Sequence, residues 1–228
     1  MLTGDMVVAT LGGPQFVADL AEAGPTKVFA WIDDKITVGE IEVSPNRFGV
    51  PSALDLDDGS SVRLSSETMV LLRNGAPRFV DQLQPGDSLL PLYTKLDSDN
   101  YLLYQQVGDW RKRALTRRDS YGWRRVSRMI AEWKMGRRCR PGDEVTFVDG
   151  DRQNHDPENI RIIEKPPRKP KKKQQFAEPI FRAHDFIRRH NHKLLAVRLD
   201  ISVELFSIRG MDGANLSVNG IFISVDME

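Results

Sequence analysis

Short apolar runs separated by tight-turn residues constrain this chain more than any other feature of its sequence. Runs rich in Val, Ile, Phe and Thr occupy residues 6–10, 27–32 and 36–38. Asp57-Asp58-Gly59-Ser60 and Arg73-Asn74-Gly75 are hairpin signals, because Asp-Gly and Asn-Gly supply the positive φ that tight turns require. The pattern predicts a series of short strands joined by hairpins.

The C-terminal end of the chain has the same character, with strand-like runs at residues 194–199, 203–208 and 220–225. Gly12-Gly13-Pro14 breaks the first strand, and residues 16–23 are long enough for one short helix. We therefore expect a curled, mostly antiparallel β fold that is closed by strands from both chain ends.

The middle of the chain changes to a helical pattern. Trp123, Val126, Ile130 and Trp133 recur at spacings of three, four and three, and this places them on one face of a helix over residues 121–135. Arginines and lysines occupy the other faces, and the Trp side chains are expected in the core rather than stacked on bases. Gly136 and the following Pro-Gly end the helix. Prolines among the lysines of residues 164–175 predict an extended, mobile linker that could track a phosphate backbone.

The net charge of +1 conceals a strong asymmetry. Residues 108–140 contain 12 Lys/Arg and 3 Asp/Glu, and residues 165–173 contain 6 Lys/Arg and no acidic residue. The remaining residues carry 15 basic and 29 acidic side chains. A basic middle on an acidic scaffold predicts a polyanionic partner, most simply the backbone of DNA or RNA. The candidate phosphate contacts are Arg111, Lys112, Arg113, Arg117, Arg118, Arg124, Arg125, Arg128, Arg137, Arg138, Lys169, Lys171, Lys172 and Lys173.

Residues 145–160, with Asp149-Gly150-Asp151 and Asp156-Pro157-Glu158-Asn159-Ile160, resemble the core of an HNH endonuclease. In that family a strand carrying a His-His pair runs through such a turn to an Asn-containing segment that opens a helix. The first His is a metal ligand and the second is the general base. Here these positions hold Thr146 and Phe147, and only Asn159 matches the residue that orients the base. A phenyl ring accepts no proton, so the resemblance implies a degenerate nuclease site.

A second resemblance covers both ends of the chain. The segments at residues 1–10, 35–40, 56–63 and 83–89 are similar to the N-terminal half of an intein, and residues 191–223 are similar to its C-terminal half. The resemblance implies a mainly β Hint fold with an inserted α+β HNH-like (ββα-metal-like) unit, as in homing-endonuclease inteins. The implied parts are residues 1–94 and 176–228 for the Hint-like halves and residues 95–175 for the basic insert and linker.

The positions that carry protein splicing in that family differ here. Splicing needs a Cys or Ser first residue, a Thr-x-x-His block that polarises the preceding peptide, and a terminal His-Asn. The chain has Met1 in the first position, and we expect Met1 to be the translation start. The block falls on Ser65 and Thr68, and the terminal pair falls on Ser224 and Val225. These differences predict a free-standing protein without splicing activity.

Composition is that of a soluble protein with room for a core, since 40% of the residues are hydrophobic. The sequence has no apolar run of the roughly 18 residues that span a bilayer and no N-terminal basic segment followed by a hydrophobic one. We expect a cytoplasmic protein, in the host cell if a phage encodes it. The single cysteine, Cys139, excludes an internal disulfide and a multi-thiolate zinc site.

Three functional hypotheses follow. The first is a nucleic-acid-binding relic of a homing-endonuclease intein that has no cofactor. The second is an interaction or structural module that binds a protein partner through its acidic Hint-like scaffold. The third is a weak nuclease that uses Mg²⁺ at a relocated site built from Asp149, Asp151 and His155. Steep salt dependence separates the first from the second, and Mg²⁺-dependent cleavage identifies the third.

Overall fold

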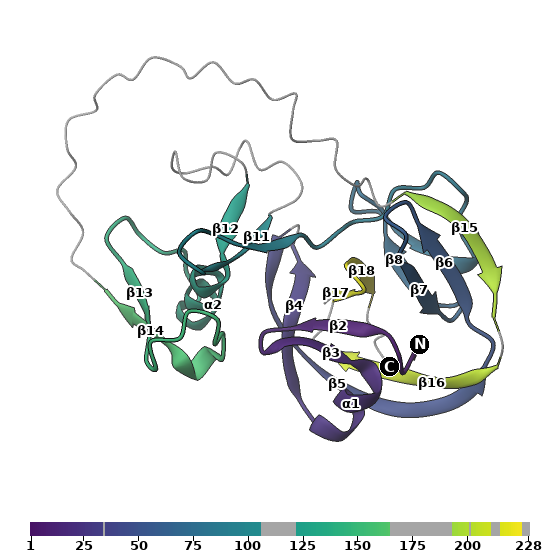
Figure 1. The fold of residues 1–228 in the computed structure, drawn as a ribbon, viewed down its shortest axis with the longest axis horizontal. Helices are drawn as coiled ribbons and strands as arrows, with labels where there is room; N and C mark the ends of the chain where they lie inside the picture. The colour runs from purple at the N-terminus through teal and green to yellow at the C-terminus, as the bar shows by residue number, and fades with distance from the viewer. Residues whose placement is uncertain (34, 106–121, 165–192, 201, 211–214, 225–228) are drawn as a thin grey trace, which may run out of the picture.

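Strands from both ends of the chain form one large antiparallel sheet, and the middle of the chain forms a smaller α+β region beside it (Figure 1). This computed structural model describes residues 1–33, 35–105, 122–164, 193–200, 202–210 and 215–224. Below, "the scaffold" denotes residues 1–94 and 176–228, and "the insert" denotes residues 95–175.

The N-terminal part of the scaffold contributes most strands of the large sheet. They are β1 (Leu2–Thr3), β2 (Val7–Thr10), β3 (Gly13–Phe16), β4 (Thr26–Ile32), β5 (Lys35–Gly49), β6 (Ser52–Leu56), β7 (Ser61–Leu64), β8 (Met69–Leu71) and β9 (Pro77–Phe79). The short helix α1 (Val17–Ala23) follows β3, and a 3₁₀ turn, η1 (Val80–Gln82), follows β9. The predicted short helix and both hairpin turns are confirmed, and Gly59 and Gly75 take the expected positive φ of 83° and 86°.

The C-terminal strands close this sheet. They are β15 (Leu194–Leu199), β16 (Val203–Gly210), β17 (Asn215–Val218) and β18 (Ile221–Ser224). In the strand order β15-β6-β7-β1-β16-β5-β4-β2-β17-β18-β8-β9, β16 lies between β1 and β5, and the β17–β18 pair lies between β2 and β8. Leu2 of β1, for example, is paired with Phe206 of β16 and with Leu64 of β7. The predicted antiparallel closure by both chain ends is therefore confirmed.

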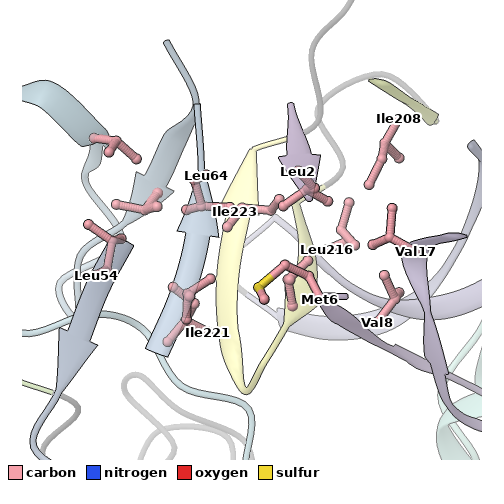
Figure 2. Packing of buried hydrophobic residues seen from close by; sticks show 14 of the residues in the cluster. Leu2, Met6, Val8, Val17, Leu54, Leu64, Ile208, Leu216, Ile221 and Ile223 are labelled. Atoms are coloured by element: carbon pink, nitrogen blue, oxygen red, sulfur yellow. The ribbon is translucent and has the colours of Figure 1, made fainter. Parts of the chain in front are cut away.

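One apolar cluster holds the two ends of the chain together. Leu2, Leu64 and Ile223 come from three separate parts of the sequence, and each is at most 3% exposed (Figure 2). Full burial of a side chain of this size contributes roughly 1.5–3 kcal/mol to folding. The scaffold therefore depends on contacts between residues more than 150 positions apart, which only the complete β fold provides.

The insert contains two small sheets and one helix. Its elements are β10 (Thr94–Leu96), β11 (Leu102–Gln105), β12 (Trp123–Arg125), α2 (Val126–Met135), β13 (Glu144–Phe147), the 3₁₀ turn η4 (Pro157–Asn159) and β14 (Ile160–Ile163). β10, β11 and β12 form one antiparallel sheet, and β13 pairs with β14. As predicted, α2 ends at Gly136, which has the left-handed φ of 63°.

Three sequence predictions for the insert were wrong. The helix begins at Val126 rather than at Tyr121, because Trp123 pairs with Gln105 of β11 as part of a strand. Trp133 is also 37% exposed, while Ser127, Met129 and Ala131 join Val126 and Ile130 as the buried residues of α2. In addition, Asn159 opens no helix, because the next residues form β14 opposite β13.

Helix α2 does not stand apart from the scaffold. Its buried residues Met129 and Ile130 belong to one hydrophobic cluster with Trp31 of β4, Val38 of β5 and Phe222 of β18. The ring centroids of Trp31 and Phe222 lie 5.8 Å apart. Insert and scaffold thus share a core, although their sequences differ in charge and in predicted structure.

Candidate functional site

The loop after β7 brings two hydroxyl groups to the start of the chain. The main-chain nitrogen of Met1 donates to Oγ1 of Thr68 at 2.8 Å and to Oγ of Ser65 at 3.2 Å. The two hydroxyl oxygens lie 2.9 Å apart, and the N–H of Ser65 donates to the carbonyl of Met1. Both side chains are buried, at 6% and 2% exposure. The sequence-predicted positions Met1, Ser65 and Thr68 therefore form one hydrogen-bonded cluster.

Ser224, at the end of β18, lies at the same place. It lines a cavity of about 10 Å³ together with Met1 and Thr68, and apolar side chains form the remaining walls: Leu2, Ile208, Leu216 and Ile223. This volume is close to what one water molecule needs. Val225, the last of the predicted splicing positions, lies outside the described residues. The serine and threonine hydroxyls can donate and accept hydrogen bonds, but they do not take up a proton near neutral pH as an imidazole does.

A second candidate site lies in the insert, in the turn between β13 and β14, here called the Asp149 turn (residues 148–159). Asn159, 9% exposed, fixes this turn by accepting from the N–H of Asp149 at 3.0 Å and donating to the Asp149 carboxylate at 2.9 Å. It also donates to the carbonyl of Asn154 at 3.0 Å. Hydrogen bonds from Asn154 and Asn159 hold the pKa of Asp149 below its ordinary value. Asn159 thus acts as the central support of the turn.

Thr146 and Phe147 lie on β13, where they pair with Arg161 and Ile160 of β14. The Phe147 ring packs against Tyr101, at a centroid distance of 6.2 Å, and meets His155 edge-on at 5.8 Å. Phe147 therefore belongs to an aromatic contact, and it has no group that could take part in proton transfer.

His155 is buried, at 2% exposure, and its Nδ1 lies 2.8 Å from the carbonyl oxygen of Gln153. Nδ1 must carry the proton to bond a carbonyl, which leaves Nε2 as an acceptor, and this atom has no partner among the described residues. Burial lowers the pKa of His155, so the neutral imidazole is favoured. Asp151 accepts from the N–H of Gln153 at 2.9 Å.

The relocated metal site expected from Asp149, Asp151 and His155 is not assembled in this arrangement. Within the part of the chain that the structure describes, no three His, Cys, Asp or Glu side chains are placed to hold one metal ion. The carboxylate of Asp149 is already engaged by Asn154, Asn159 and the N–H of Asp151.

The predicted phosphate contacts fall into three groups. Three described arginines form ion pairs with acidic residues of the insert. Arg124 pairs with Glu132, and Arg137 pairs with Asp143 and Glu164. A guanidinium nitrogen of Arg125 lies 3.7 Å from a carboxylate oxygen of Asp97. Arg128 and Arg138 are exposed. The other predicted contacts lie outside the described residues, namely Arg111, Lys112, Arg113, Arg117, Arg118, Lys169, Lys171, Lys172 and Lys173.

Sequence analysis did not predict that Arg152 stacks on the same ring as Arg125. Its guanidinium carbon lies 4.7 Å from the ring centroid of Tyr101, and that of Arg125 lies 3.6 Å from the same centroid. Stacking on an aromatic ring orients a guanidinium group and leaves N–H donors at its edge. The basic character of residue 152 was visible in the sequence, but its pairing with a ring 51 positions away required the fold.

The whole fold resembles solved intein structures. A crystal structure of the Ssp DnaB mini-intein variant M86 superposes with a TM-score of 0.53 at 11% identity, over 100% of this chain and 94% of that chain. The G-1F mutant of the same variant gives 0.52 at 10% identity, over 99% and 98%. The chain has an intein fold. The mainly β intein-like architecture predicted from the chain ends is thereby confirmed, while the HNH-like nature of the insert stays a prediction.

A DnaB intein from Synechocystis sp. PCC 6803 gives a TM-score of 0.49 at 9% identity, over 99% of this chain and 98% of that chain. No family model and no curated protein matches the sequence. Among the described residues, neither helix has the length and apolar character needed to cross a membrane. The intein fold is thus recognised through structure, at a sequence identity where the fold alone is shared.

Proposed function

We propose that this chain is an intein-derived protein that has lost protein splicing and DNA cleavage and that binds nucleic acid through its basic insert. The observation that carries the proposal is the separation of charge, with a net +15 on residues 108–140 and 165–173 and a net −14 on the rest. A concentrated positive charge attracts the phosphate backbone and gains affinity from the release of counterions.

Loss of splicing is supported by the cluster around Met1. Thr68 takes the position that the intein resemblance assigns to an imidazole, and its hydroxyl is used to bind the Met1 main chain and Ser65. Ser224 borders the same cavity and has a hydroxyl where the family has the terminal His. A proton acceptor for acyl transfer is missing from these residues, while the hydrogen bonds that hold the fold are kept.

Loss of cleavage is supported by Phe147 and Asn159. Phe147 stands where the HNH resemblance places the general base, and it packs between Tyr101 and His155. Asn159 keeps the position of the orienting residue, but its amide supports the Asp149 turn. The framework of a nuclease turn persists here as a folding element, and we infer that the insert binds without cutting.

Within the described part of the insert, the exposed arginines Arg128 and Arg138 are the best direct phosphate contacts, since neither forms an ion pair with another described residue. Arg128 lies on the exposed face of α2, and Arg138 follows the helix. Arg125 and Arg152, which stack on the Tyr101 ring, are two further basic side chains of the insert, and Arg152 lies within the Asp149 turn.

The test compares wild type with Arg128→Glu/Arg138→Glu in binding to a labelled duplex at about 50 mM salt. We expect the double variant to bind at least tenfold more weakly for any duplex sequence, because phosphate contacts carry no sequence information. Lys35→Glu/Arg47→Glu, which makes the same charge change at exposed scaffold positions, is the matched control. If both variants bind the duplex equally weakly, binding depends on the overall charge of the protein and not on the insert.

The same samples incubated with Mg²⁺ test the alternatives. Intact product strands are expected. Mg²⁺-dependent strand breaks would establish the weak nuclease, and an absence of binding by wild type would favour the module that binds a protein through its acidic scaffold.

A further inference from the structure

Cationic side chains lie over aromatic rings on one face of the three-stranded sheet β10-β11-β12. Lys95, Leu103 and Arg125 are neighbours across the three strands, so their side chains share a face. Tyr104 belongs to the opposite face, where it is 1% exposed in the core that insert and scaffold share. The face with Lys95 and Arg125 is therefore the outer one, and here Nζ of Lys95 lies 4.3 Å from the centroid of the Trp123 ring.

Two arginines from different elements converge on Tyr101, which directly precedes β11. The guanidinium carbon of Arg125, in β12, lies 3.6 Å from the Tyr101 ring centroid, and that of Arg152, in the Asp149 turn, lies 4.7 Å from it. The Arg125 side chain is 39% exposed, and Arg152 is also exposed. Two cations held on one ring repel each other, and an anion bound by both lowers this energy. The cluster therefore favours an anionic ligand that reaches both guanidinium groups.

Contacts within the insert fix both arginines and use only part of their hydrogen-bonding capacity. The Asp97 carboxylate accepts from the N–H of Asp99 and of Tyr101, which shapes the turn before β11. The same carboxylate lies 3.7 Å from Arg125, and the Asp99 carbonyl accepts from Nη1 of Arg152 at 2.7 Å. Among the residues that the structure describes, no carboxylate forms an ion pair with Arg152. Each guanidinium group has more N–H donors than these contacts use.

We propose that Arg125 and Arg152 together bind one phosphate group beside the Tyr101 ring, and that this phosphate belongs to a nucleic-acid backbone. The nucleic-acid source rests on the proposed function, whereas the phosphate site rests on the geometry of Tyr101 and its two arginines. Phosphate fits because a planar guanidinium group donates paired N–H bonds to its oxygens. Tyr101 is a positioning residue, since its ring orients both arginines. Lys95 adds a further cation to the same outer face.

The first test compares wild type with Arg125→Gln/Arg152→Gln in binding to a labelled duplex over about 50–200 mM salt. The variant should bind at least tenfold more weakly at the lowest salt concentration, and the slope of log affinity against log salt should fall by about 0.9, the value for one phosphate. Lys35→Gln/Arg47→Gln makes the same charge change at exposed scaffold positions and should bind nearly as wild type does. Equal binding by both double variants would overturn the phosphate site, although binding by wild type would keep the proposed function.

The second test changes the ring and keeps every charge. Tyr101→Leu leaves both arginines without their platform and should weaken duplex binding about threefold or more. Tyr101→Phe keeps the ring and should bind as wild type does. Urea unfolding of both variants checks that each is folded under the conditions of the binding assay. Equal affinity of Tyr101→Leu and wild type, or equal losses in the two variants, would overturn the positioning role of Tyr101.

The third test separates the phosphate site from nucleic-acid binding. Inorganic tripolyphosphate is titrated into the protein by calorimetry at about 50 mM salt. Wild type should bind it, and Arg125→Gln/Arg152→Gln should bind at least tenfold more weakly. Wild type that binds tripolyphosphate but no duplex would support the phosphate site and overturn both its nucleic-acid source and the proposed function. Wild type that binds neither probe would overturn the site as well.

Discussion

The main-chain nitrogen of Met1 lies 2.8 Å from Oγ1 of Thr68, although the two residues are 67 positions apart. The contact joins the first strand of the sheet to the loop after β7, inside the core that both chain ends build. A hydroxyl at this place binds the main chain but does not relay protons at neutral pH. We interpret the contact as structural: it ties β1 to its neighbours at positions where the intein resemblance predicts splicing residues.

Replacing Thr68 by Val should destabilise the fold. The change keeps the shape of the side chain but removes the acceptor for Met1 and the partner of Ser65, and leaving buried polar groups unsatisfied costs about 1–3 kcal/mol. Urea unfolding of Thr68→Val measures this loss. Ser66→Ala, at an exposed position in the same loop, should stay within about 0.5 kcal/mol of wild type. Equal stability of Thr68→Val and wild type would show that the hydrogen bonds among Met1, Ser65 and Thr68 do not stabilise the fold.

Asn159→Ala should destabilise the insert more than Asn154→Ala does. Asn159 is buried and makes three hydrogen bonds across the Asp149 turn, whereas Asn154 is exposed and can be replaced by water. The expected cost at Asn159 is about 2–3 kcal/mol, against less than about 1 kcal/mol at Asn154. Denaturant unfolding measures both, and the reverse order would show that the turn does not depend on Asn159.

Stability should fall as the pH drops below about 6.5, and His155 should cause part of this fall. Burial lowers the pKa of His155 in the folded chain, although the Gln153 carbonyl and Asp151 act in the opposite direction. The unfolded chain therefore binds the proton more readily, so the contribution of neutral His155 is present above the unfolded-state pKa and is lost below it. The stability difference between wild type and His155→Leu should shrink from pH 7 to pH 5. A constant difference over that range would contradict the assignment.

Ile130→Ala should weaken the scaffold as well as the insert. Ile130 is fully buried in the cluster that contains Trp31 and Phe222, and a cavity of this kind costs about 2–5 kcal/mol. Amide hydrogen exchange should show reduced protection in β4 and β5 together with α2. Val148→Ala, at an exposed position, serves as the control. Loss of protection confined to the insert would mean that the two parts unfold separately.

Much of the scaffold was predictable from local patterns. Alternating apolar runs and the Asp-Gly and Asn-Gly turns predicted the β6–β7 and β8–β9 hairpins, and the intein resemblance predicted pairing between the chain ends. The start of α2 was missed, because Trp123 has a helical spacing to Val126 but pairs with Gln105 of β11. Pairing with a strand residue 18 positions away determines the conformation of Trp123, although its local spacing is helical. The helical spacing of residues 123–133 does not indicate that strand partner.

The candidate sites were only partly predictable for the same reason. Residue type and position indicated Met1, Ser65, Thr68 and Asn159, but the hydrogen bonds they make depend on the fold. The arginine set was predicted from charge alone. Charge could not show that Arg124 and Arg137 are bound by Glu132 and Asp143, or that Arg152 stacks on Tyr101.

The most direct test of nucleic-acid binding by the insert is the affinity of the purified protein for a mixed-sequence duplex, measured at several salt concentrations from about 50 to 200 mM. A plot of log affinity against log salt should be linear and steep, with a slope of about −0.9 for each phosphate contact. Arg128→Glu/Arg138→Glu should reduce the slope by about 2. A flat plot, or no measurable binding at the lowest salt concentration, would contradict nucleic-acid binding by the insert.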